Sequence, residues 1–191
     1  MAARTDNVTD PALAARLLLM RRGQAYWARA LNDLSDDELD EPSLVAGWTR
    51  RHVIAHVGFH ARAIARLVEG ARTGSAVLMY DSPHQRDEEI SFGSTLPAEA
   101  LRNLCAHAAV HLNVEWRDLP ERAWVTPVDV DGVGIVPVSE TVRIRAREVW
   151  LRAVDLGSGA GITDLPPELH ALLRERSPAD LAAGPDSLPT E

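Results

Sequence analysis

The segment that decides the fold reads TRRHVIAHVGFHARAIARLVEGAR, from Thr49 to Arg72. Thr49 is a residue type that caps helices, and it follows the chain breakers Pro42 and Gly47. Beyond it, apolar residues and histidines recur at intervals of three and four positions. This stripe consists of Val53, His56, His60, Ile64 and Leu67. The spacing predicts a long helix that carries two histidines on its buried face.

Three further segments have helical periodicity. The sequence predicts helices from Asp10-Pro11 to about Leu34, from Pro97 to about Leu119, and from Ser139 to Leu156. Gly157 ends the last of them, since glycine tolerates the backbone conformation that closes a helix.

Two long connections separate these helices. Residues 73–96 are rich in turn formers, which predicts a loop with one helical turn at Gln85 to Ile90. Residues 124–137 combine β-branched residues with glycines, which predicts a connection that contains a small β-hairpin around Asp131-Gly132.

Four long helices joined in this way predict an all-α four-helix bundle, in which sites form from side chains of facing helices. We expect the bundle to span residues 1–160. Residues 161–191 are expected to form a short helix at Pro167 to Arg176 and a flexible tail, because Pro, Ala, Asp and Gly dominate that tail.

The composition limits the function classes. The chain has 191 residues, of which 46% are apolar, so it can bury the core of one globular domain. A net charge of −8 argues against a nucleic-acid partner. No run of apolar residues is long enough to span a membrane. With a single cysteine, Cys105, and no basic and apolar leader, we expect a cytoplasmic location. We also expect a monomer or a homodimer.

All 20 basic residues are arginines. The absence of lysine excludes Schiff-base and lysine general-base mechanisms, whereas guanidinium recognition of carboxylates stays open.

A second segment, REVWLRAVDL from Arg147 to Leu156, completes a candidate site. Glu148 and Arg152 lie one helical turn apart, so they share a face that can meet His56. A catalytic zinc ion needs three protein ligands and one open position, which a histidine and a Glu-x-x-x-His pair would provide. Arg152 stands where the second histidine would be, and a guanidinium has no lone pair for a metal and repels a dication.

Two hypotheses retain a metal. In the one we favour, His60 replaces the missing ligand, and the site consists of His56, His60 and Glu148. In the other, His56 and Glu148 hold a metal weakly together with water.

Two hypotheses need no metal. In one, Arg152 pairs with Glu148 or Asp155, and the pocket binds an anion. In the other, His52, His56 and His60 are ordinary partly buried histidines.

Arg86 lies in the central connection, and its guanidinium could form a fork to a substrate carboxylate at the mouth of the bundle. The alternative is a surface ion pair with Asp87 or Glu89, which would contribute little.

Three stretches in the same order and spacing carry a family resemblance. They are GWTR at 47–50 with His56, the stretch from Met79 to Ile90 with Arg86, and REVW at 147–150 followed by AVDLG at 153–157. Over about residues 10 to 160, the chain resembles the mycothiol-dependent maleylpyruvate isomerase family, part of the DinB-like group of metal-binding four-helix bundles.

The resemblance implies a zinc site, mycothiol as the thiol cosubstrate and a small dicarboxylate as the substrate. By position, His56 and Glu148 match metal ligands, and Arg86 matches a substrate-binding arginine. Two residues depart from the pattern, since Arg152 replaces the third ligand and His60 stands where the family commonly has asparagine. Family members of this activity also usually carry a further small C-terminal domain.

The chemistry that the resemblance implies is isomerisation of maleylpyruvate to fumarylpyruvate by addition and elimination of a thiolate, or a closely related thiol S-transfer. Arg152 could then act as a catalytic and substrate-binding residue, because its charge can stabilise an anion without a metal. The alternative is a non-catalytic, metal-free bundle that binds a thiol or an anionic small molecule.

Overall fold

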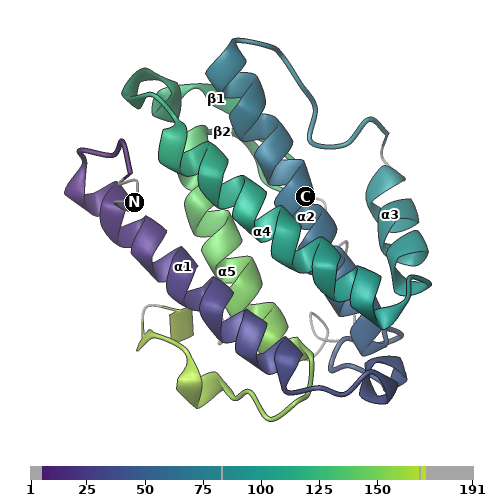
Figure 1. Cartoon of the computed structure of the whole chain (residues 1–191). Coiled ribbons are helices and arrows are strands. Elements are labelled where there is room, and N and C mark those ends of the chain that lie inside the picture. The colour runs from purple at the N-terminus through teal and green to yellow at the C-terminus, as the bar shows by residue number, and fades with distance from the viewer. Residues whose placement is uncertain (1–5, 83, 168, 171–191) are drawn as a thin grey trace, which may run out of the picture.

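A computed structural model describes residues 6–82, 84–167 and 169–170. Within them, four long helices form a bundle (Figure 1): α1 (Pro11–Asn32), α2 (Arg50–Thr73), α4 (Ala98–Asp118) and α5 (Val138–Asp155). Helix α2 packs mainly against α4, α1 packs against α5, and α2 also contacts α5. The predicted helical bundle is confirmed, and the contact between α2 and α5 brings the two candidate site segments together.

The ends of the long helices follow from their capping residues. The carboxylate of Asp10 accepts a hydrogen bond from the amide of Ala12 at 2.9 Å, and Pro11 occupies the first turn of α1. Helix α2 begins after Thr49 and ends at Gly74, whose φ of 76° lies in the left-handed region.

Short 3₁₀ helices occupy three of the connections. They are η1 (Asp37–Asp40), η2 (Glu121–Val125) and η3 (Ile162–Asp164). The short helix predicted at 167–176 lies mostly outside the described residues.

The central connection holds a full helix, α3 (Gln85–Ser94), where the sequence predicted one helical turn. Its first five residues are all polar, so local hydrophobic periodicity is weak. Packing against α2 supplies the missing stabilisation, since Ile90 and Gly93 are buried there. A Cβ atom at Gly93 would lie 2.6 Å from Cβ of Ala55, which shows how closely the two helices approach.

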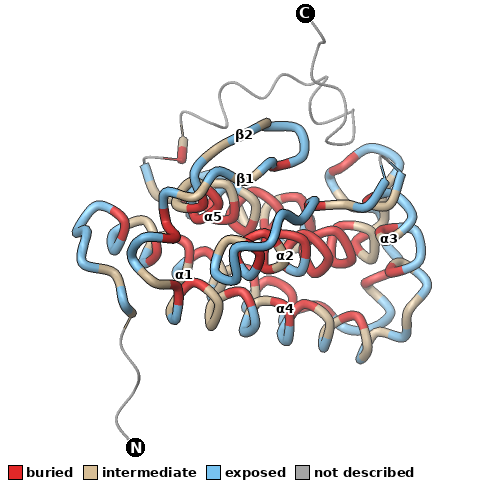
Figure 2. The backbone as a smooth tube through the Cα atoms, turned by 90° about the horizontal axis from the view of Figure 1, so that it is seen from above, coloured by how far each residue is buried: buried red, intermediate tan, exposed pale blue. Residues whose placement is uncertain are grey.

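The predicted β-hairpin is confirmed. Strands β1 (Pro127–Val130) and β2 (Gly134–Pro137) pair in antiparallel register, with Val128 opposite Val136. Figure 2 shows the hairpin lying across one side of the bundle, above α2 and α5 in that view.

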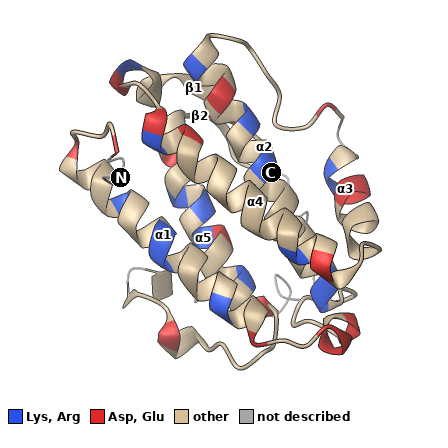
Figure 3. Ribbon diagram, viewed as in Figure 1, with Lys and Arg blue, Asp and Glu red and all other residues tan. Residues whose placement is uncertain are grey.

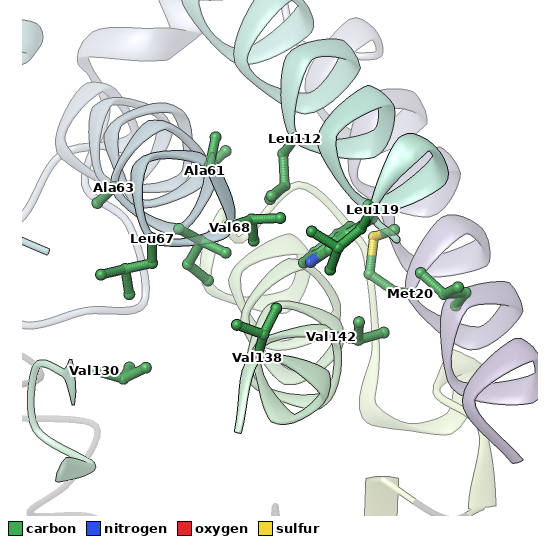
Figure 4. Packing of buried hydrophobic residues seen from close by; sticks show 14 of the residues in the cluster. Met20, Ala61, Ala63, Leu67, Val68, Leu112, Leu119, Val130, Val138 and Val142 are labelled. Carbon is green, nitrogen blue, oxygen red and sulfur yellow. The ribbon is translucent and has the colours of Figure 1, made fainter. Parts of the chain in front are cut away.

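The buried apolar residues form two clusters, one toward each end of the bundle. The cluster in Figure 4 includes Met20 of α1, Leu67 of α2, Leu112 of α4 and Val142 of α5. The other is centred on Trp27, Ile54, Leu101 and Val149. Within the described part of the chain, no helix is both long and apolar enough to cross a membrane.

Candidate functional site

The site begins at a direct contact between α2 and α5. Nε2 of His56 lies 2.5 Å from Oε1 of Glu148, and both side chains are largely buried. Residues 92 positions apart in the sequence therefore meet at the interface of two helices.

Arg152 extends this contact into a chain of charged groups. Its Nε donates to Oε1 of Glu148 at 2.7 Å, and its Nη1 donates to Oδ2 of Asp155 at 2.8 Å. Arg152 and Asp155 are 5% and 1% exposed, so this ion pair lies inside the protein. The guanidinium thus bridges two carboxylates of its own helix.

The neighbouring charges determine the protonation of the pair. Burial raises the pKa of Glu148, but Arg152 and His56 outweigh it and hold the pKa of this carboxyl well below its usual range. Burial lowers the pKa of His56, with Glu148 opposing that shift. The site therefore contains a carboxylate, a neutral imidazole and a guanidinium in contact.

His60 lies one turn further along α2, with its ring 5.8 Å from that of His56. Its partner is Arg145, whose Nη1 lies 3.3 Å from Nδ1 of His60 and donates to the carbonyl of Val57 at 2.9 Å. Burial lowers the pKa of His60 to about 3. Nη2 of Arg145 reaches Oε1 of Gln24 on α1 at 3.2 Å, so one buried guanidinium connects three helices.

The donor atoms do not fit a three-ligand metal site. Among the described residues, no group of three or more histidine, cysteine, aspartate and glutamate side chains is arranged to hold a metal ion. Two ligands of one tetrahedral zinc lie about 3.3 Å apart, whereas the facing atoms of His56 and Glu148 touch at 2.5 Å. The proposed set of His56, His60 and Glu148 is close together in space, but Nε2 of His56, Oε1 of Glu148 and Nδ1 of His60 are each engaged in a hydrogen bond.

Arg86 approaches the site from α3. It is 8% exposed, and its charge helps to lower the pKa of His56 after the larger effect of burial. Its Nη1 lies 3.5 Å from Oδ1 of the exposed Asp87, the surface pair considered from the sequence. Burial raises the pKa of Tyr80, and the nearby charge of Arg86 opposes that shift.

Tyr80 lines a cleft of about 670 Å³ between residues 78–82 and the hairpin residues 129–134. The charge of Glu148 also contributes to the raised pKa of Tyr80. The cleft is therefore within electrostatic reach of the site.

The GWTR stretch has a structural role that the sequence did not reveal. Arg50 donates from Nε to the carbonyl of Leu156 at 2.8 Å and from Nη2 to that of Gly157 at 3.1 Å. It thereby ties the start of α2 to the end of α5. Trp48 stacks at a tilt on His56, with ring centres 5.8 Å apart.

Arg145 and Gln24 are further residues that sequence reasoning missed. A signal for Arg145 was present, because it occupies the apolar stripe of α5 between Val142 and Val149, both fully buried. Figure 3 shows that α5, which lies between α1 and α4 in that view, carries several basic residues.

The remaining candidates lie elsewhere. Cys105 is buried and donates to the carbonyl of Ile54, and burial raises its pKa to about 12, as expected for an inert thiol. His107 and His111 lie on an exposed face of α4.

Comparisons with known proteins show the family of the chain. Residues 20–157 match the family described as Mycothiol maleylpyruvate isomerase N-terminal domain. A crystal structure of the mycothiol-dependent maleylpyruvate isomerase is 46% identical, with a TM-score of 0.80, and the match covers 83% of this chain and 65% of that one. A mutant of that enzyme in which one histidine is replaced by alanine gives 45% identity and the same TM-score and coverage. No curated protein matches. The chain thus belongs to the mycothiol maleylpyruvate isomerase N-terminal domain family.

Proposed function

We propose that the chain acts in the mycothiol-dependent cis–trans isomerisation of a maleylpyruvate-like dicarboxylate, or in a closely related thiol transfer. The observation that carries the proposal is the buried contact of His56, Glu148 and Arg152 between α2 and α5. It lies within a segment that is 46% identical to an enzyme of that activity.

The reaction needs an anionic nucleophile and a place for negative charge. A thiolate adds to one carbon of the cis double bond, and the displaced electron pair moves onto the neighbouring carbonyl oxygen. The former double bond is then single and rotates. When the carbonyl forms again, the carbon–sulfur bond breaks, and the trans isomer and the thiolate are released.

The arginines supply the electrostatic part of this reaction. Guanidinium groups next to a thiol lower its pKa and stabilise the enolate oxygen, and they act more strongly where water is excluded. Arg152 is largely buried, and Arg86 on α3 lies within electrostatic reach of His56. We infer that Arg86 binds a substrate carboxylate and that Arg152 stabilises the anion.

A purified sample tests the proposal directly. Maleylpyruvate and mycothiol are incubated with the protein, and proton NMR follows the alkene signals of the cis and trans isomers. We expect trans product only when protein and thiol are both present. If the protein neither isomerises maleylpyruvate nor conjugates the thiol to any electrophile, the proposal is wrong.

A second function is a non-catalytic bundle that binds a thiol or an anion. The pairing of Arg152 with both Glu148 and Asp155 favours it, because these contacts occupy the guanidinium. Calorimetric binding of mycothiol or a dicarboxylate without turnover would support this function over the first.

A further inference from the structure

We propose that this chain has exchanged the divalent metal of its site for the Arg152 guanidinium, so that the cluster of His56, Glu148, Arg152 and Asp155 works without a resident metal. The inference concerns the same site as the proposed function and rests on that function only for the ligand. Its support is the direction of each hydrogen bond in the cluster.

The first step concerns His56. The guanidinium of Arg152 lies 2.7 Å from Oε1 of Glu148, which makes this group an ionised acceptor. The contact of 2.5 Å between the same oxygen and Nε2 of His56 therefore uses a proton on the histidine nitrogen. A protonated ring nitrogen has no lone pair, so the atom that faces Glu148 cannot ligate a metal.

The second step concerns His60, the substitute ligand. A guanidinium can only donate, so Nδ1 of His60 accepts the hydrogen bond from Nη1 of Arg145. The single proton of the neutral ring then lies on Nε2. One nitrogen of His60 is thus occupied by a cation and the other carries hydrogen, which leaves no free lone pair for a metal.

The third step concerns the position of Arg152. Its Nη1 pairs with Asp155, which is 1% exposed, while its Nε pairs with Glu148. Rotating the guanidinium away to admit a metal would break both ion pairs inside the protein, where such losses are costly. Arg152 is therefore held in the third-ligand position.

The fourth step is the charge balance. The arginines that act on the site are Arg152, Arg86 and Arg145, and the carboxylates are Glu148 and Asp155. The exposed Asp87 also pairs with Arg86, so these groups carry no excess negative charge that would attract a dication, and their guanidiniums favour an anionic ligand. The ligand class that fits this site is a thiolate or a carboxylate.

Metal titration of the full-length, chelator-treated protein tests the inference. Zn²⁺ binding is measured by calorimetry, and Co²⁺ is used in parallel because tetrahedral coordination gives a visible absorption spectrum. We expect that the unaltered chain does not bind either ion one-to-one at this site, so His56→Ala should change nothing in the titration. Arg152→His should gain one-to-one binding of both ions by at least about tenfold, the lower end of what single changes beside a metal do to affinity.

Two variants control for the added histidine and the lost charge. Arg143→His adds a histidine to the exposed side of α5 and should gain nothing. Arg152→Gln removes the guanidinium without adding a strong ligand, and it should gain less than Arg152→His. Circular dichroism confirms that each variant is folded.

Three results would overturn the inference. One is submicromolar, one-to-one zinc binding by the unaltered chain that His56→Ala abolishes. Another is a folded Arg152→His variant without a gain, and the third is an equal gain in Arg152→Gln. If Arg152→His does not fold, the titration of the unaltered chain still decides. None of these measurements uses turnover, so failure of the proposed isomerase activity would be seen separately.

Discussion

Nε of Arg50 on α2 donates to the carbonyl oxygen of Leu156 at the end of α5, at a distance of 2.8 Å. This contact joins the two helices that carry the site. The same guanidinium also reaches the carbonyl of Glu38 at 3.0 Å and the carboxylate of Glu41 at 2.8 Å. One side chain therefore satisfies acceptors of two segments, 38–41 and 156–157.

Replacing this side chain should destabilise the fold. Arg50→Met leaves the carbonyl of the buried Leu156 without its charged donor and breaks three further hydrogen bonds, and we expect a loss of about 2–4 kcal/mol in the free energy of unfolding. Urea denaturation measures it. Arg66→Met, on a more exposed side chain of the same helix, is the control and should change stability by less than about 0.5 kcal/mol. Equal effects of the two variants would contradict the structural role.

The contact between α1 and α5 depends on a glycine. A Cβ atom at Gly23 would lie 2.5 Å from Nε1 of Trp150 and 2.7 Å from Cγ2 of Val149. Gly23→Ala should therefore destabilise the protein by about 1–3 kcal/mol through overpacking, although alanine favours helix. Ala25→Gly, on an exposed position of α1, measures the propensity effect alone. A stability gain in Gly23→Ala would show that the helices can separate at little cost.

The buried His60 predicts acid sensitivity. Its pKa is about 3 in the folded chain and 6.5 as the ordinary value, so between these pH values the unfolded chain binds a proton that the folded chain does not. Stability must then fall as the pH falls through this window. Glu148 acts in the same direction at lower pH, because its pKa is held below 4.5.

His60→Asn removes the first of these effects while keeping an acceptor for Arg145. Between pH 6.5 and 5.0, we expect this variant to lose about 1.5 kcal/mol less stability than the unaltered chain. Urea denaturation at the two pH values gives the difference. His107→Asn, at an exposed position on α4, should lose as much as the unaltered chain. If all three proteins lose the same amount, His60 is not neutral in the fold.

Arg86 should determine substrate affinity. Arg86→Met removes a charge-assisted bond to a carboxylate, so KM for maleylpyruvate should rise about 10-fold to 100-fold. Arg86→Lys keeps the charge but loses the forked hydrogen bond, and its KM should lie between those of the unaltered chain and Arg86→Met. Steady-state kinetics at saturating thiol measures both. A variant with reduced kcat and unchanged KM would place Arg86 outside the substrate contact.

Cys105 should be unreactive in the native protein. Its thiol is buried, donates to the carbonyl of Ile54 and has a pKa raised to about 12. A disulfide reagent at pH 8 should therefore modify no thiol in buffer and one per chain in denaturant. Rapid modification of the folded protein would mean that the α2–α4 contact opens readily.

Much of the fold followed from local sequence. The long helices repeat apolar residues over many turns, and Asp10 and Thr49 mark the starts of two of them. The full length of helix α3 was not predicted from the sequence. Ten residues with weak periodicity form a helix only when Ile90 and Gly93 pack on α2.

Part of the site was likewise predicted from the sequence, and part was not. Helical spacing was enough to put Glu148 and Arg152 on one face, since residues four apart share a face. That His56 meets Glu148 was implied by the family resemblance, in which both match metal ligands. The buried Arg145, its hydrogen bond to His60 and the tie from Arg50 to α5 were not predicted.

Residue types and spacing therefore predicted the bundle, and the family resemblance added the family and the members of the cluster. They could not say which nitrogen of each histidine carries a proton or whether Arg152 faces Glu148, Asp155 or both. Those properties depend on contacts between helices that are far apart in the chain. In a buried site, the nearest donor or charge determines whether a lone pair remains for a ligand.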